Sequence, residues 1–367
     1  MLFCFRWIVS LIEMFVHPEE NNEKNSGRDS DLAGVGSVLV RLQPRPEVVV
    51  DRAMRTAMID ALVAKLNDHY VFPEKARQFE AVLRQREREG RYEKIRDGYR
   101  LAQQLTADIH GVAKDLHLKV RFAPGLDLVG EMGAAPATQA EWEQRTNFIE
   151  RLMARRTAAR EVKKVGRLGP DVGYLKISSF PDALPVADKF GAAMDELADT
   201  EGLVVDLRQN GGGDPQAVAL LISYFVDRPT RLNDIWDRDT GNTVQQWTHD
   251  KLVGKRYGGS KPVMILVGPR TASAGEDFAY TMQALRRATV VGERTWGGAH
   301  PMGFYRIGEH FFAQIPNQRS ISPITGTNWE GAGVTPDIAV APDQALVVAM
   351  DLMRRRPQGS GTLAAAP

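Results

Sequence analysis

Residues 202–213 read Gly-Leu-Val-Val-Asp-Leu-Arg-Gln-Asn-Gly-Gly-Gly, and residues 263–275 read Val-Met-Ile-Leu-Val-Gly-Pro-Arg-Thr-Ala-Ser-Ala-Gly. Each stretch begins with a continuous apolar run, which is typical of a strand buried on both faces of a sheet. Each run then passes through a glycine-containing turn into a stretch with helical spacing. Strands that alternate with helices in this way predict an α/β fold.

The same alternation extends over residues 171–353, with further strands expected at 172–178 and 289–291 and helices at 187–198, 215–225 and 275–285. Upstream, apolar residues recur at helical spacing from Met54 to Tyr70, and two further helices are expected by residue 110. This spacing predicts a small N-terminal helical domain over residues 51–125. It ends in an expected strand at 116–122, where His117 is a polar member of an alternating pattern. Residues 126–170 are expected to form a linker and a charged helix over 141–164.

Composition excludes several classes of protein. The chain of 367 residues has 47 Lys+Arg and 46 Asp+Glu, so it lacks the basic excess that a nucleic-acid partner requires. Its one cysteine, Cys4, cannot build a thiolate metal cage or a Cys-pair redox centre. Hydrophobic residues make up 43% and charged residues 25%, the balance of a globular protein. The composition leaves the oligomeric state open.

The two ends of the chain are expected to be variable or disordered, over residues 1–50 and 354–367. The run from Leu2 to Val16 is apolar, but Arg6 and Glu13 interrupt it. It is shorter than the about 20 residues that a transmembrane helix needs, so we expect no stable membrane span. If this run is a signal peptide the protein is secreted or periplasmic, and otherwise it is cytoplasmic.

The two glycine-containing turns are the first candidates for chemistry. The main-chain N–H groups of residues 211–213 can bind an oxyanion, although a tight strand-to-helix turn needs the same glycines. Ser273 begins an expected helix, where it can act as a nucleophile beside the N–H of Ala274. Ser273 and Glu276 also have the spacing of a capping box, in which the serine only caps the helix.

A serine nucleophile needs a base and an orienting carboxylate. Among the histidines, His117 stands out because it lies beside Asp115, and His300, in a glycine-rich loop, is the reserve candidate. His69 and His110 lie on expected helices and are interpreted as structural or exposed. Glu330, between Trp329 and Gly331, is either the orienting carboxylate or a solvated loop residue.

Taken together, the segments 203–213, 263–283, 290–301 and 333–337 resemble the C-terminal processing, or tail-specific, serine proteases. The resemblance implies a ClpP/crotonase-like core of stacked βαβ units. It implies Ser273 as the nucleophile and places the oxyanion donors at Gly212 or Gly213 and at Ala274. The bacterial processing enzymes pair their serine with a lysine, but Gly298 stands at that position here, so the Ser–Lys dyad is absent.

The sequence is more similar to the branch that contains tricorn-type core proteases and interphotoreceptor retinoid-binding protein. Tricorn-type enzymes use Ser, His and Glu, and the matching positions here are Ser273, His117 and Glu330. Many processing proteases also contain a PDZ domain before the core. The interval from Phe122 to Val172 is too short for a domain of typical size, so no PDZ domain is expected.

The residues and the resemblance leave three alternative functions. The first is a serine peptidase that hydrolyses peptides or proteins and needs no metal or organic cofactor. The second is a catalytically silent carrier for an apolar ligand, like the retinoid-binding relatives. The third, an acyl-CoA enzyme of the crotonase type, leaves Ser273 and Glu330 without a role.

Overall fold

The computed structural model describes residues 48–124, 162–181 and 183–355. The expectations for the N-terminal apolar run, for most of the linker and its charged helix, and for the C-terminal tail lie outside these residues. No helix within the described ranges combines the length and apolar character needed to cross a membrane.

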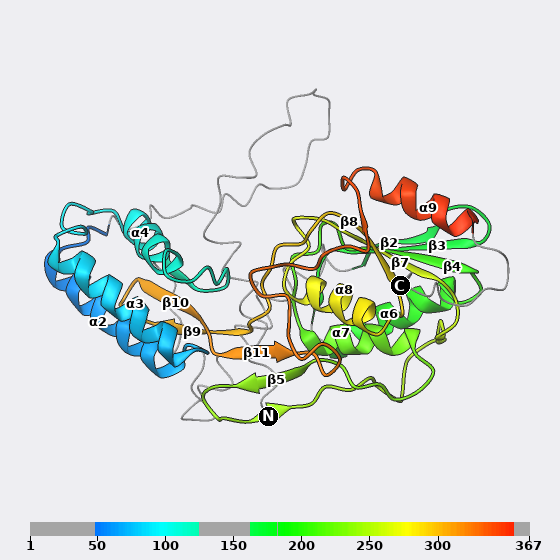
Figure 1. The fold of residues 1–367 in the computed structure, drawn as a ribbon, viewed down its shortest axis with the longest axis horizontal. Coiled ribbons are helices and arrows are strands. Elements are labelled where there is room, and N and C mark those ends of the chain that lie inside the picture. The colour runs from blue at the N-terminus through cyan, green and yellow to red at the C-terminus, as the bar shows by residue number, and fades with distance from the viewer. Residues whose placement is uncertain (1–47, 125–161, 182, 356–367) are drawn as a thin grey trace, which may run out of the picture.

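The centre of the larger lobe is a six-stranded sheet (Figure 1). Neighbouring strands are parallel except for the antiparallel pair of β2 and β3 at one edge. Across the sheet the order is β12 (Ile338–Ala339), β8 (Thr289–Gly292), β7 (Val263–Val267), β4 (Gly202–Asp206), β3 (Val172–Ile177) and β2 (Val162–Arg167). A mixed α/β fold around a central sheet is therefore confirmed.

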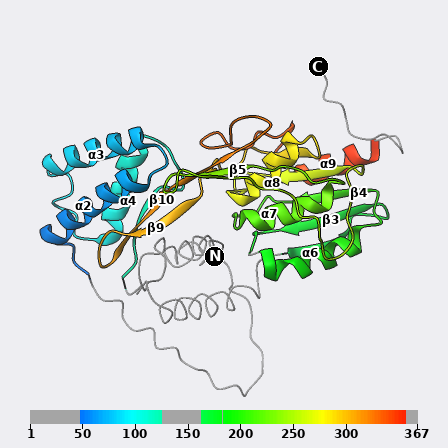
Figure 2. The ribbon, with the colours of Figure 1, turned by 90° about the horizontal axis from the view of Figure 1, so that it is seen from below.

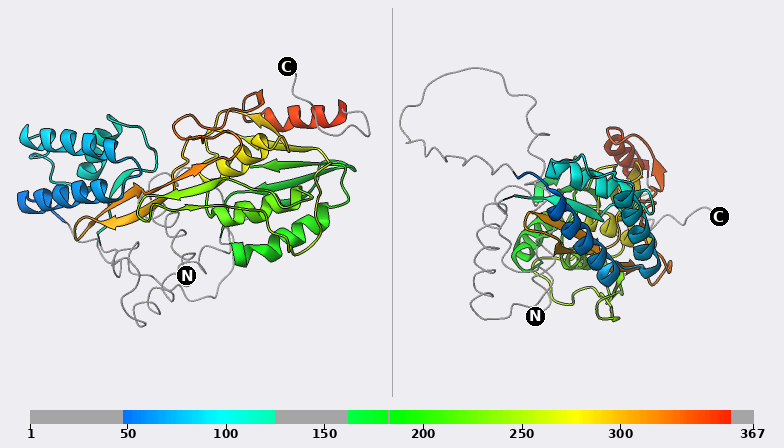
Figure 3. Two further views of the ribbon diagram at one scale, coloured as in Figure 1. Left: turned by 60° about the horizontal axis from the view of Figure 1, so that its bottom comes forward. Right: turned by 90° about the vertical axis from the view of Figure 1, so that its left-hand side faces the viewer.

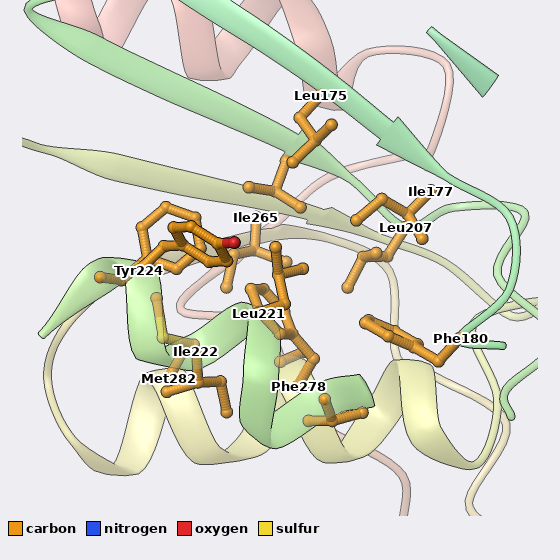
Figure 4. Packing of buried hydrophobic residues seen from close by; sticks show 14 of the residues in the cluster. Leu175, Ile177, Phe180, Leu207, Leu221, Ile222, Tyr224, Ile265, Phe278 and Met282 are labelled. Carbon is orange, nitrogen blue, oxygen red and sulfur yellow. The ribbon is translucent and has the colours of Figure 1, made fainter. Parts of the chain in front are cut away.

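Helices cover both faces of this sheet (Figure 2). One face packs against α6 (Ala183–Leu197), α7 (Pro215–Ile222) and α8 (Ala274–Ala284), and the other packs against α9 (Ala345–Arg355). Alternate side chains of a strand point to opposite faces, so Val205 faces α7 and α8 while Val204 faces α9. Figure 4 shows Leu175 and Ile265 of the sheet above Leu221 and Phe278 of the helices.

The smaller lobe is built from both halves of the chain (Figures 1 and 3). Its helices are α2 (Arg52–His69), α3 (Pro73–Arg88) and α4 (Gly98–His110). They pack on an antiparallel sheet in the order β1 (Lys119–Phe122), β10 (Phe311–Pro316) and β9 (Met302–Arg306). Leu62 of α2, Leu105 of α4 and Phe311 of β10 are fully buried in its core.

A third sheet lies between the lobes in the view of Figure 1. It contains β11 (Gln318–Ile321), β5 (Asp234–Asp237) and β6 (Thr243–Val244), and a short 3-10 helix, η2 (Ser223–Phe225), follows α7.

The structure corrects the predicted ends of two elements. The strand expected from residue 116 begins only at Lys119, and His117 lies in the turn before it. Asp115 closes that turn, because its Oδ1 accepts the His117 N–H at 3.2 Å and its carbonyl accepts the Leu118 N–H at 3.1 Å. The charged helix expected to reach Lys164 does not do so, because residues from Val162 onward pair with β3 as an edge strand.

Candidate active site

The sheet brings the two glycine-containing turns to the same edge. β4 and β7 are adjacent and parallel, with Asp206 opposite Leu266, so the turns that follow them leave the sheet side by side. The turns also contact directly: the Ala272 N–H donates to the Asn210 carbonyl at 2.9 Å, and Thr271 Oγ1 donates to the Leu207 carbonyl at 2.8 Å. In open α/β sheets this edge is where ligands bind.

Glycines 212 and 213 allow the first turn to fit against the second. Gly212 has φ +101°, and a Cβ atom there would lie 2.7 Å from the Cβ of Ser273. Gly213 has φ +141°, and a Cβ atom there would lie 1.8 Å from the carbonyl oxygen of Phe180. Both positions therefore need glycine, for backbone conformation and for space.

Ser273 adopts a backbone conformation that is rare for a residue with a side chain. Its φ is 52° and its ψ is −118°, and it immediately precedes α8. Such strain costs of order 1–3 kcal/mol and is found most often at functional sites, where the surrounding structure maintains it. This serine is therefore placed at a helix N-terminus in a conformation that simple capping does not require.

The Glu276 carboxylate holds Ser273 to a distant loop. It is fully buried, and its Oε2 accepts the Ser273 N–H at 2.9 Å and the Gly298 N–H at 3.0 Å. Its Oε1 accepts the Gly297 N–H at 2.6 Å and the Thr295 hydroxyl at 2.5 Å. Burial raises the pKa of Glu276, and these four hydrogen bonds oppose that rise. The bond from Ser273 is one half of the expected capping box, but the same carboxylate also fixes residues 295–298 beside the serine.

His117 lies next to that loop. Its buried ring meets the Trp296 ring edge-to-face at a centroid distance of 5.0 Å. A Cβ atom on Gly298 would lie 2.6 Å from Cε1 of His117. Gly298 and Ser273 donate to the same carboxylate oxygen, so His117 packs on a residue that Glu276 links to the serine turn.

Glu330 lies close to His117, as the sequence predicts for a triad. Side-chain ligand atoms of Asp115, His117 and Glu330 are all within 4.8 Å of one another. Glu330 Oε2 accepts the Ala299 N–H at 2.6 Å, so the carboxylate is held by the segment that follows Gly298. Burial, followed by the charge of Asp115, raises the pKa of Glu330 to about 7.

Asp115, His300 and Tyr70 extend this cluster, and their joint role was not predicted. His300 Nδ1 lies 3.0 Å from Asp115 Oδ2, and the Tyr70 hydroxyl donates to the same oxygen at 3.1 Å. The neighbourhood of Asp115 to His117 was visible in the sequence, but nothing local indicated that a loop 185 positions later would return to this aspartate. His300, the reserve candidate for the base, is thus engaged with carboxylates.

His69 and His110, which the sequence predicts to be structural or exposed, contact groups outside the candidate triad. His69 Nδ1 is 2.9 Å from Asp239, and His110 Nε2 is 2.8 Å from the carbonyl oxygen of Leu118. His110 therefore contacts the end of the turn that contains His117.

Three main-chain amides were predicted to bind an oxyanion. In this structure the Gly212 N–H donates to Asn210 Oδ1 at 2.9 Å, so that amide is engaged within its own turn. The N–H groups of Gly213 and Ala274 are then the better candidates. The Ala274 nitrogen is close to the glycine turn, at 3.3 Å from the position of a Cβ atom on Gly212.

The cluster of Asp115, His117 and Glu330 has the dimensions of a metal site, but three of its four carboxylate oxygens already accept hydrogen bonds. Both oxygens of Asp115 and Oε2 of Glu330 already accept hydrogen bonds, from Tyr70, the His117 amide, His300 or the Ala299 amide. A metal ion would have to displace these donors, so we assign none to this cluster.

Comparison with known proteins supports the relation to processing proteases. Residues 171–340 match the profile of peptidase family S41, and residues 43–154 match the N-terminal domain of Peptidase_S41 in eukaryotic IRBP. The carboxy-terminal-processing protease of Bartonella bacilliformis is 27% identical over 187 residues, which is 47% of this chain and 40% of the relative. Carboxy-terminal processing protease CtpB of Bacillus subtilis is 28% identical over 47% of this chain and 34% of its own length.

Other known proteins are similar to this chain over a smaller part of their own length or at lower sequence identity. Tricorn protease of Thermoplasma volcanium is 27% identical over 48% of this chain but only 15% of its own. The chain thus spans less than half the length of these three curated relatives. Among solved structures, a lipoprotein from Streptococcus agalactiae superposes with a TM-score of 0.55 at 15% identity, covering 82% of this chain and 96% of that one.

Mature CPAF superposes with a TM-score of 0.51 at 13% identity, covering 85% of this chain and 99% of that one. At these identities the two superpositions show a shared fold, which includes both lobes because most of this chain is covered. The sequence matches carry the assignment of family. Residues 171–340 of this chain belong to peptidase family S41, and the N-terminal domain that accompanies that family precedes them.

Proposed function

We propose that this protein is a serine peptidase that hydrolyses peptide bonds through a triad of Ser273, His117 and Glu330. The observation that supports this most strongly is the convergence of three distant segments on one loop. Glu276 fixes that loop beside Ser273, His117 packs against its Gly298, and Glu330 accepts the amide of Ala299. We also propose that the core is of the ClpP/crotonase-like type that the sequence resemblance implies.

In the proposed reaction, His117 takes the proton of the Ser273 hydroxyl as Oγ attacks the substrate carbonyl carbon. The amides of Gly213 and Ala274 donate hydrogen bonds to the oxyanion of the tetrahedral intermediate. His117 then gives the proton to the leaving amine, and water releases the acyl group in a second step of the same kind. Glu330 orients the imidazole and stabilises its protonated form.

The substrate is proposed to be a peptide or an unfolded segment of a protein. Several curated relatives are named for the processing of carboxyl termini. Gly298 supports a histidine base over a lysine base, because a longer side chain at this position would overlap both His117 and the ring of Trp296.

Covalent labelling separates this proposal from the carrier function. An alkyl fluorophosphonate reacts with serines that are activated by a neighbouring base, and peptide mass spectrometry locates the adduct. We expect the adduct on Ser273 in the wild type and none in the Ser273→Ala or His117→Gln variants. A protein that binds an apolar ligand but gives no adduct at Ser273 would be a carrier.

A further inference from the structure

We propose that His300 and Asp115 form a buried ion pair that positions Glu330 and sets the charge around His117, so that both are positioning residues for catalysis. This inference rests on the proposed hydrolysis by Ser273, His117 and Glu330. It concerns two residues outside the triad, one of which was considered as an alternative base.

His300 faces two carboxylates at once. Its Nδ1 is 3.0 Å from Asp115 Oδ2 and 3.4 Å from Glu330 Oε2. The side chains of His300 and Asp115 are only 4% and 3% exposed, so water contributes little to their solvation. The Ala299 N–H reaches the same Glu330 oxygen. Two consecutive residues therefore hold Glu330 Oε2 and fix the orientation of the carboxylate.

Asp115 connects this arrangement to the base. Its Oδ1 accepts the main-chain N–H of His117 at 3.2 Å, while its Oδ2 is shared by His300 and the Tyr70 hydroxyl. Asp115 thus fixes both the backbone of His117 and the imidazole of His300, which faces Glu330. A displacement of either member of the pair would be transmitted to two members of the triad.

The pKa shifts agree with an ionised pair. Burial lowers the pKa of His300, but the hydrogen bond to Asp115 and the charges of Glu330 and Asp115 outweigh burial and raise it. Burial raises the pKa of Asp115, but the hydrogen bond and charge of His300 and the charge and amide of His117 outweigh burial and lower it. Both shifts favour the charged forms of His300 and Asp115, as an ion pair requires.

Other titratable and charged groups also face the pair. Burial and then Asp115 raise the pKa of the Tyr70 phenol, so it stays neutral. From β11, the charge of Arg319 opposes protonation of His300. The groups on the packed elements that act on the pair or on Tyr70 include Tyr70 at the end of α2, Glu74 of α3, His117 before β1, Arg319 of β11 and Glu330.

Removing each member of the pair should shift the pH dependence in opposite directions. In Asp115→Asn the anion that faces Glu330 is removed, which lowers the pKa of Glu330. In His300→Gln the cation that faces Glu330 is removed, which raises the pKa of Glu330. The proposed triad is active when Glu330 and His117 are deprotonated. The acidic midpoint of activity should fall in the first variant and rise in the second.

The experiment measures the rate of fluorophosphonate labelling of Ser273 from about pH 5 to pH 9, a range that brackets the unperturbed pKa of histidine. We expect the acidic midpoint to move down by about one unit in Asp115→Asn and up by about one unit in His300→Gln. The double variant should lie between them. His69→Gln and Asp239→Asn are matched controls, because they disrupt a His–Asp pair of 2.9 Å outside this cluster and should leave the midpoint unchanged.

Both variants could label Ser273 with a lower maximum rate but without opposite shifts of the acidic midpoint. That result would reduce the pair to a purely structural role and overturn the proposal. If one single variant does not fold, thermal unfolding of the double variant tests the ion pair instead. Removing one member of a buried ion pair costs more stability than removing both, so we expect the double variant to fold and to be more stable than the remaining single variant. A double variant that is no more stable than that single variant, or that does not fold, would overturn the ion pair. Absence of Ser273 labelling in the wild type would instead contradict the proposed function itself.

Discussion

Position 298 has no room for a side chain. Gly298 donates its amide to Glu276, and a methyl group in its place would lie 2.4 Å from the Trp296 ring and 2.6 Å from His117. The sequence revealed the missing lysine at this position, and the structure supplies the physical reason. The space that a lysine side chain would need is filled by the imidazole and indole rings.

Gly298→Ala should therefore displace His117 or Trp296. Overpacking at such a site typically costs 1–3 kcal/mol, and we expect a loss of about 2 kcal/mol in the free energy of unfolding. We also expect fluorophosphonate labelling to slow by at least about tenfold, because small displacements of a catalytic group are expensive. Gly308→Ala is the control, since the nearest atom there is 3.8 Å away. Unchanged labelling in Gly298→Ala would separate His117 from the activation of Ser273.

Glu276 offers a second test among single residues. Glu276→Gln replaces one acceptor oxygen by a donor, facing amides and a hydroxyl that also donate. An unsatisfied buried group costs about 1–3 kcal/mol, and we expect chemical denaturation to show a loss in that range. Labelling of Ser273 should weaken as well, whereas the exposed Glu309→Gln should change neither quantity. A fully stable and reactive Glu276→Gln would show that the serine turn does not need this carboxylate.

The pH dependence of the wild type follows from Glu330. Its pKa is raised to about 7 by burial and by Asp115, and the ionised form is the one that can orient a protonated His117. Labelling of Ser273 should therefore fall as the pH drops through about 7, instead of being constant down to the pKa of about 4.3 of an ordinary glutamate. In Glu330→Gln the plateau should fall, with the acidic limb then set by His117. A wild-type rate that is flat between pH 5 and pH 8 would exclude this role.

The helices and strands that the sequence predicted best are those whose own residues show a clear apolar pattern. The continuous apolar runs of β4 and β7 and the helical spacing of α2 depend on neighbouring residues, and each was placed within a residue or two. The β9–β10 hairpin was missed, and the pairing of β10 with β1 could not be predicted from local sequence because nearly 200 positions separate the two strands. The alternating pattern predicts a strand at His117, but Asp115 determines the backbone there and forms a turn.

The same distinction holds for the candidate site. Ser273 and the glycine turn were found because each follows a recognisable strand. The contact of His300 with Asp115 depends on tertiary packing, which leaves no mark on local sequence.

Strand β1, which follows the turn that contains His117, is supported by α4. Thr106 Oγ1 accepts the Val120 N–H at 2.9 Å and donates to the Ala102 carbonyl at 2.8 Å. In Thr106→Val, which has almost the same shape, the Val120 amide loses its partner. We expect a stability loss of about 1–3 kcal/mol by urea denaturation, together with slower labelling. The exposed Thr243→Val serves as the control, and equal stability of the two variants would contradict a role for this contact.

At the scale of the whole molecule, the chain crosses between its lobes more than once. The core of the smaller lobe joins α2, α3 and α4 to Phe311 and Ile315 of β10, although β10 lies within the segment matched to family S41. The proposed base, His117, and the proposed nucleophile, Ser273, thus come from segments on either side of the lobe boundary. We infer that the two lobes do not unfold independently.

Phe311→Ala tests this coupling. Truncation of a fully buried phenylalanine costs about 3–5 kcal/mol, and the cavity would open in the core that β10 shares with the three helices. Hydrogen exchange should show loss of protection in α2, α3 and α4, far away in sequence, together with slower labelling of Ser273. Val347→Ala, at a residue 64% exposed on α9, should leave the exchange pattern unchanged. Loss of protection confined to β9 and β10 would show that the lobe does not depend on the hairpin.

Hydrolysis of a mixed peptide library by the wild type and by Ser273→Ala tests the central claim most directly. Loss of the nucleophile of a Ser–His–acid triad lowers turnover by a factor of the order of 10⁶, so we expect cleavage products to appear with the wild type and to fall by at least about a thousandfold in the variant. Mass spectrometry of the products gives both rates in one experiment. Equal rates of cleavage by the two proteins, or no cleavage by either, would contradict a peptidase that depends on Ser273.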